Sequence, residues 1–417
     1  MSASHTAKRP RRTISQPAAY LLAASVIGLA LFASGTPSPL YGTYSELWGF
    51  SPEILTLVFA TYAFGVLTSL VLAGRVSDEV GRRPVLLVSL TTLTLVTIPF
   101  MLADSLVWLF VARGIQGLAT GLALSAAGAA LLDLHPRRDS HSVALANGVA
   151  SMLGLGLGVL ASSLIVEFLP APRVLPYALL LVLFSLALLA TFFMPEPGEV
   201  LPGARVRLTP QRPSIPPVVR RPFVLAGLAV LSSWSIGGLF FSLGPQLSSI
   251  LFDSTNHVVE GLNIFVLAGA GALAQLAFGR VAPWASAAFG SVALALGMGT
   301  IVAASAAGSG ALLVVGSIVA GVGFGAAFLG GLRTLSAAIP AEHRAGVMAA
   351  FYIAAYASLS LLAVAAGFVV GSLGVTDTFE IFGTAIAGLA LVVAFEAWRT
   401  RPIAAGSRSE RRAAQLA

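Results

Sequence analysis

The dominant pattern along this chain is a series of long apolar runs separated by short polar segments. A helix needs about 20 apolar residues to cross a hydrocarbon core roughly 30 Å thick, and twelve runs come close to this length. Because the runs are continuously apolar, whereas the strands of membrane barrels alternate, they predict helices. The predicted spans are residues 18–41, 53–73, 85–103, 106–132, 143–167, 175–194, 223–247, 258–279, 285–306, 309–332, 346–372 and 377–398.

The positions of lysine and arginine predict how these spans are oriented. Cytoplasmic loops of membrane proteins carry an excess of basic residues, and 22 of the 24 here lie in the termini or the even-numbered connections. The odd-numbered connections contain Arg173 alone, and Arg113 falls inside the fourth predicted span. Both termini are therefore predicted to be cytoplasmic, in a multi-pass protein of the cell membrane, the plasma or inner membrane.

An internal repeat divides the spans six and six. Short motifs recur at an offset of 204 or 205 residues: Gly117 and Gly121 recur as Gly321 and Gly325, Pro136 as Pro340, Val143 as Val347, and Gly74 as Gly279. One transporter class consists of two parallel repeats that handle substrate between them near mid-membrane. We expect an all-α membrane protein with 12 transmembrane helices in two pseudo-symmetric six-helix halves. The predicted segments are a cytoplasmic tail at 1–17, halves at 18–194 and 222–398, a cytoplasmic linker at 195–221, and a cytoplasmic tail at 399–417.

Composition supports a membrane protein and excludes several functions. Only 10% of the residues are charged, whereas soluble domains carry about 25%. The net charge of +7 lies mainly on one predicted side, so it indicates orientation and not binding to nucleic acid. The chain has no cysteine, which excludes disulfides and thiolate chemistry. It also has no Walker loop and no His-x-x-x-His spacing, so we expect no enzyme, cofactor or metal site.

The second cytoplasmic loop and the fourth span carry the most specific motifs. The loop reads Gly74-x-x-x-Asp78-x-x-Gly81-Arg82-Arg83, and a simple basic loop would explain its arginines but not its glycines and aspartate. The fourth span contains Arg113, Gln116 and Gly117. A charged side chain within a span costs about 2.5–3.5 kcal/mol, so Arg113 is expected to face a partner or a wet cavity. Partial snorkelling to the external interface is the alternative.

Both motifs resemble those of the major facilitator superfamily of transporters, and the chain looks like one of its efflux-like members. Glu79 stands where the family usually has arginine. The resemblance implies that the loop acts as a cytoplasmic latch that helps hold the halves together in the outward-facing state. It also implies a role in proton transfer for Arg113, with Gln116 and Asp133 as further polar candidates.

Small residues in two spans predict close helix packing. Gly117 and Gly121 share a face of the fourth span, and Gly154 and Gly158 share a face of the fifth, where backbones can approach closely. In drug–proton antiporters of the family the fifth span carries Gly-x-x-x-Gly-Pro, but here Val159 replaces the proline. The face therefore predicts packing without the antiporter mark.

Sparse polar and aromatic residues within the spans are candidates for a substrate cavity. They are Tyr62, Asn147, Trp234, Gln275, Tyr352 and Tyr356, and for each one taken singly helix packing is at least as probable as a substrate contact.

No predicted span has a carboxylate at its centre, which weakens proton coupling without excluding it. Three prolines near outer helix ends, Pro37, Pro39 and Pro245, predict breaks in the first and seventh helices.

Together these features predict a secondary transporter that moves a small organic solute by alternating access. Proton-coupled export of drug-like compounds is the favoured function. Proton-coupled uptake of a sugar or organic acid is the alternative, and a transport-dead membrane sensor or scaffold is the alternative from another class. The expected partners are a small-molecule substrate, the lipid bilayer and protons as coupling ion, with no nucleic acid, and the expected state is a monomer.

Overall fold

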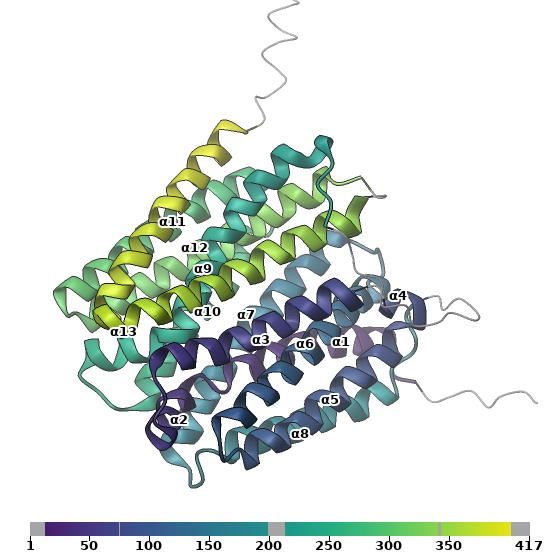
Figure 1. Ribbon diagram of the computed structural model, residues 1–417. Coiled ribbons are helices and arrows are strands. Elements are labelled where there is room, and N and C mark those ends of the chain that lie inside the picture. The colour runs from purple at the N-terminus through teal and green to yellow at the C-terminus, as the bar shows by residue number, and fades with distance from the viewer. Residues whose placement is uncertain (1–12, 75, 199–212, 341–342, 402–417) are drawn as a thin grey trace, which may run out of the picture.

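The computed structural model describes residues 13–401 except 75, 199–212 and 341–342, and every regular element in this described part is helical (Figure 1). Most of the predicted tails and part of the predicted linker fall outside the described residues. The helices are α1 Gln16–Gly35, η1 Ser38–Leu40, α2 Tyr41–Trp48, α3 Pro52–Ala73, α4 Val76–Val80, α5 Arg82–Leu102, α6 Leu106–Leu134, α7 Ser140–Phe168, α8 Leu175–Phe192, η2 Pro217–Val219, α9 Arg220–Phe252, α10 His257–Phe278, α11 Pro283–Ala307, α12 Gly310–Ala338 and α13 Arg344–Arg399.

The predicted twelve spans are all present, although two of them form one continuous element. Eleven described segments are long and apolar enough to cross a membrane. The last of them, α13, contains both final spans, which meet at Gly374 with φ 85° and ψ 174°. A positive φ of this size favours glycine, whose missing Cβ permits the sharp change of direction. Large apolar side chains such as Leu102 and Val107 face outward from the bundle, as a lipid environment requires.

The first helix ends just before Pro37 and Pro39, whereas the seventh continues through Pro245. The first predicted span ends early, because α1 stops at Gly35 and Pro37 begins a turn into η1 and α2. The break predicted at Pro245 is wrong, since α9 continues through it to Phe252. Pro245 has no N–H for the carbonyl of Phe241 four residues earlier. That carbonyl instead accepts a hydrogen bond from the Ser38 hydroxyl at 3.1 Å, so the helix persists.

The helices form two groups that meet along a seam. Helices α1 to α8 make up the first half and α9 to α13 the second, in the lower and upper parts of Figure 1. The seam consists of α7 packed on α10 and α3 packed on α13. We call the end of the bundle where α1 begins and α13 ends the terminal face, and the other end the opposite face. Helix α4 lies at the terminal face and α2 at the opposite face (Figure 1).

The sequence repeat corresponds to a repeated helix contact. Gly117 of α6 lies so close to α3 that a Cβ would collide with the carbonyl oxygen of Tyr62. Gly321 of α12 has the same relation to the carbonyl oxygen of Leu267 in α10. The fourth span therefore packs on the second, and the tenth on the eighth, through the same glycine one repeat apart. Glycine permits this approach because it leaves the partner backbone unobstructed.

The glycines of the fifth span make a similar contact within the first half. Gly154 lies against the carbonyl of Gly28, and one turn later Gly158 lies against the carbonyl of Phe32. Both contacts join α7 to α1, and they face away from α10. Helix α7 is thereby fixed to the first half on one side while its other side forms the seam.

These contacts predict that Gly117→Ala and Gly321→Ala destabilise the protein to a similar extent. The added methyl must displace a backbone, and such overpacking typically costs about 1–3 kcal/mol. We expect each variant to lower the melting temperature of the purified protein by about 5 °C. Gly128→Ala is the matched control, because a Cβ at Gly128 meets no atom within 4 Å. Equal melting temperatures for all three variants would contradict the packing argument.

Candidate functional site

The side chain of Arg113 is fully buried in α6 and is held by neutral groups. Its Nε and Nη2 donate to the hydroxyl of Tyr41, the former at 3.0 Å. Its Nη1 donates to the carbonyl of Ser34 at 3.2 Å and to Oε1 of Gln116 at 2.9 Å. With 0% of the residue exposed, snorkelling does not occur in this structure. Among the described residues, none of the ion pairs includes Arg113.

The end of α1 explains how a buried cation is stabilised without a carboxylate. Pro37 has no N–H, so the carbonyl of Ala33 lacks its usual partner four residues later. This carbonyl accepts from Nε2 of Gln116 at 3.0 Å, and the neighbouring carbonyl of Ser34 accepts from Arg113. The C-terminal end of a helix also carries partial negative charge, which favours a nearby cation. By ending α1, Pro37 leaves backbone carbonyls free to accept hydrogen bonds from Arg113 and Gln116.

An aromatic group extends from Arg113 across the seam. The guanidinium carbon of Arg113 lies 5.3 Å from the ring centroid of Tyr62 in α3, within the range of a cation–π interaction. Tyr62 and Tyr356 of α13 belong to one buried cluster, and the ring of Trp234 in α9 lies 4.9 Å from that of Tyr356. We call Tyr62, Tyr356 and Trp234 the seam patch. The indole N–H of Trp234 has no hydrogen-bond partner among the described residues.

The other predicted cavity residues are Tyr352, Gln275 and Asn147. Tyr352 packs in a neighbouring cluster that also contains Trp234. Gln275 of α10 is fully buried at the seam, where its amide lies directly against Gly148 of α7. Neither amide atom of Gln275 finds a partner in the described part of the chain. Asn147, the residue before Gly148 in α7, is half-buried.

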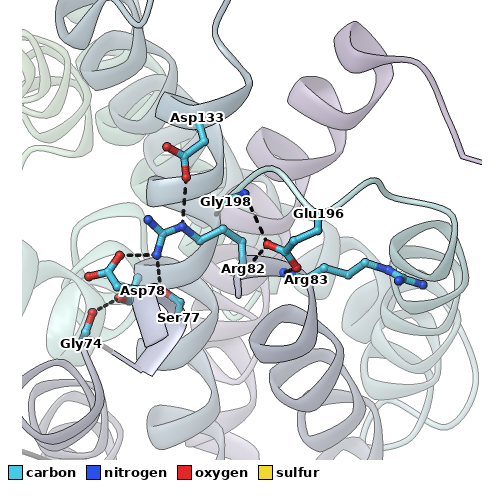
Figure 2. A network of polar contacts seen from close by, with 9 residues as sticks. Gly74, Ser77, Asp78, Arg82, Arg83, Asp133, Glu196 and Gly198 are labelled. Atoms are coloured by element: carbon cyan, nitrogen blue, oxygen red, sulfur yellow. Dashed lines mark hydrogen bonds and ion pairs between the residues drawn. The ribbon is translucent and has the colours of Figure 1, made fainter. Parts of the chain in front are cut away.

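Residues around the junction of α4 and α5 form a separate polar network at the terminal face (Figure 2). Arg82 lies between two carboxylates: its Nη1 binds Asp78 and its Nε donates to Asp133 at 3.0 Å. The Ser77 hydroxyl accepts from the same Nη1 at 3.2 Å. Gly74 accepts a hydrogen bond from Ser125 of α6 through its carbonyl at 3.1 Å. All these contacts join elements of the first half, so the network fixes α4 and α5 to α6.

Asp133, a polar candidate like Arg113 and Gln116, lies apart from them at the other end of α6. It sits near the end of α6 at the terminal face and belongs to the network around Arg82. Gly81, the N-cap of α5, has φ 102°, a conformation that favours glycine.

Sequence reasoning missed Glu196, which follows α8 and caps α5. Its two carboxylate oxygens accept the backbone N–H groups of Arg82 and Arg83 at 2.7 and 3.1 Å (Figure 2). A carboxylate is favoured there because the first N–H groups of a helix lack partners and carry partial positive charge. The Arg83 side chain in turn donates to the carbonyls of Thr191 and Phe192 at the end of α8. The only sequence signal for Glu196 is its place just after a span.

The sequence is similar to those of known membrane transporters. The family model of the Major Facilitator Superfamily matches residues 23–309. The MFS-type transporter traF of Penicillium crustosum is 30% identical over 195 residues, which are 46% of this chain and 40% of that protein. The multidrug resistance protein MdtL of Escherichia coli is 26% identical over 151 residues, 36% of this chain and 38% of that protein. The chain thus spans about two fifths of the length of these curated relatives.

Two solved structures have the same fold over nearly the whole chain. The human organic anion transporter MFSD10 (TETRAN) has a TM-score of 0.68 at 20% identity, covering 92% of this chain and 100% of that one. The xylose transporter XylE from E. coli, in a partially occluded inward open conformation, has a TM-score of 0.72 at 14% identity, covering 93% and 98%. Family and fold point to a transporter and not to an enzyme. With the family model matching well over half of its length, this chain belongs to the Major Facilitator Superfamily.

Proposed function

We propose that this transporter exports drug-like organic compounds in exchange for protons, by rocking residues 18–194 against 222–398. The observation that carries the proposal is the seam patch, where aromatic rings from both halves meet beside unpaired polar groups. Aromatic faces with a few directed polar groups suit an amphipathic organic molecule. Trp234 and Gln275 each hold a buried polar group without a described partner, and a substrate between the halves would satisfy them.

The similarity to a protein named for multidrug resistance supports export over uptake. The patch is built from aromatic rings and apolar neighbours such as Leu67, Leu70 and Leu359, whereas a sugar site would need many hydrogen-bonding groups. Uptake of a sugar or organic acid therefore remains the second candidate.

For the proton, we propose that Arg113 acts as a fixed charge and not as the carrier. An arginine side chain stays protonated in proteins, so Arg113 cannot itself release a proton. It orients the hydroxyl of Tyr41 and lies over the ring of Tyr62, which places a permanent positive charge beside the patch. This charge would repel a proton or cationic substrate that enters the seam.

We further propose that the terminal face is cytoplasmic and that the loop at 74–84 is the latch of that side. The excess of lysine and arginine at this face supports the orientation. The ion pairs of Arg82 with Asp78 and Asp133 hold this segment to the first half, which supports a latch that moves with that half. We expect the protein to work as a monomer in the cell membrane.

The direct test is substrate flux in proteoliposomes that contain the purified protein. With a pH gradient imposed, a lipophilic or aromatic organic solute is expected to move against its own gradient while protons move the other way. A panel of sugars and organic acids in the same vesicles tests the second candidate. The absence of substrate-dependent proton movement for every compound would refute coupled transport and would favour a sensor or scaffold.

Trp234→Phe is expected to change substrate recognition without changing the aromatic packing. The variant removes the unpaired indole N–H but keeps a ring between Tyr356 and Phe328. A net hydrogen bond is worth about 0.5–1.5 kcal/mol, so we expect KM to rise about three- to ten-fold for substrates that carry an acceptor. Substrates without an acceptor should be unaffected. Trp398→Phe is the control, because Trp398 is 53% exposed near the end of α13.

Asp78→Asn is expected to slow transport at equal surface expression. The substitution removes one of the two carboxylates that hold Arg82 and leaves Asp133 to bind it alone. We expect the transport rate to fall several-fold while the melting temperature changes little, since exposed ion pairs contribute about 0–1 kcal/mol. Asp104→Asn, an exposed carboxylate at the opposite face, is the control. Transport at the wild-type rate in Asp78→Asn would remove the latch from the proposal.

A further inference from the structure

A polar contact between the two halves crosses the seam at the opposite face, whereas the network of Arg82 lies within the first half at the terminal face. Glu167 lies in the last turn of α7 and is half-buried. Its Oε1 accepts from Nδ2 of Asn256 at 3.0 Å, and its Oε2 accepts from the backbone N–H of His257 at 3.0 Å. The acceptor belongs to the first half and both donors to the second. One carboxylate thus joins the halves with both of its oxygens.

The donors of this contact are themselves held in place. Asn256 is the N-cap of α10 and accepts from the N–H of Val258 at 2.8 Å through its Oδ1. Its Nδ2 is thereby directed to Glu167. The ring of His257 pairs with Glu260 at 3.2 Å, and Glu260 accepts from the hydroxyl of Ser249 in α9 at 2.8 Å. The contact therefore extends from α7 through the start of α10 to α9.

The Glu167 carboxylate interacts favourably with the N-terminus of α10. The first N–H groups of a helix have no partner within the helix and carry partial positive charge. An ionised carboxylate that accepts two N–H groups forms charge-assisted hydrogen bonds, which are stronger than neutral ones. Glu167 belongs to the first half and the N-terminus of α10 to the second. The favourable interaction therefore exists only while the two halves are in contact at this face.

The packing beneath the contact shows what opening would require. One turn closer to the centre, Gly261 of α10 lies directly against the hydroxyl of Ser163 in α7. Further in, Val159 and Ile264 are both fully buried in a cluster shared by the two halves. The opposite face is therefore closed along this pair of helices. It can open only if α7 and α10 separate, which breaks both hydrogen bonds of Glu167.

We propose that Glu167 is a clasp that closes the opposite face by capping α10 across the seam. It is a positioning residue that sets the balance between the two access states. The inference rests on the proposed rocking of the halves, and in the proposed orientation this face is the external side. Because each charge-assisted hydrogen bond shifts an equilibrium roughly ten-fold or more, the clasp is strong enough to hold the face closed until substrate or protons drive opening.

Cysteine labelling tests the clasp, since the chain has no cysteine of its own. Two single-cysteine reporters are placed on α7, both against α10. Ser163→Cys reports on the opposite face, and Leu145→Cys reports on the terminal face, where Leu145 lies beside Gly279. The full-length protein in lipid nanodiscs is labelled with a polar maleimide, and the rate is measured for each reporter. No substrate is added, so a failure of the clasp is distinct from a failure of the transport assay.

Glu167→Gln is expected to raise the labelling rate at Ser163→Cys about ten-fold, because the amide offers one acceptor and no charge. The rate at Leu145→Cys should fall, since opening one face by rocking closes the other. Asn256→Asp is a second variant that keeps an acceptor for the N-cap but places two carboxylates together, and it should act in the same direction. Asp104→Asn should leave both rates unchanged. Faster labelling at both faces would indicate loosening of the structure, and that result or an unchanged rate at Ser163→Cys overturns the proposal.

Discussion

Backbone groups inside a membrane must find partners within the protein, and this constraint organises the structure around its prolines. Pro37 and Pro245 each free a carbonyl four residues earlier. The freed carbonyl of Ala33 accepts from Gln116, and that of Phe241 accepts from Ser38. The first contact builds the neutral cage of Arg113, and the second joins the halves. The prolines that interrupt helix hydrogen bonding are therefore the points where polar side chains bind the backbone.

Glycine contacts determine where these anchored groups can meet. Equivalent glycines, Gly117 and Gly321, pack the fourth span on the second and the tenth on the eighth, so the two halves share this helix contact. Each half can then behave as a stiff unit with its polar and aromatic residues directed to the seam. The seam patch joins Tyr62 of one unit to Tyr356 and Trp234 of the other. The close contact between Ser163 of α7 and Gly261 of α10 lies along the same seam.

Sequence reasoning predicted the fold well and the site unevenly. Twelve spans and the repeat followed from apolar length and glycine spacing, because both depend on local composition. A partner for Arg113 was expected, but the carbonyl cage was not, since it depends on where α1 ends beside α6. The break at Pro245 was wrong because a distant hydroxyl compensates for the missing N–H. Glu196 and Glu167 were missed, since each caps a helix far away in sequence.

The sequence by itself determined the class of protein: the apolar runs, the repeat and the loop motif together left a membrane transporter with two related halves. It also identified Arg113, Tyr62, Trp234 and Tyr356 as unusual, because polar or aromatic groups in apolar spans are visible in one dimension. Only the tertiary structure decided which of them meet and which carboxylate binds which helix. Those contacts join residues 50 to 300 positions apart, and their formation depends on helix packing, which no local pattern encodes.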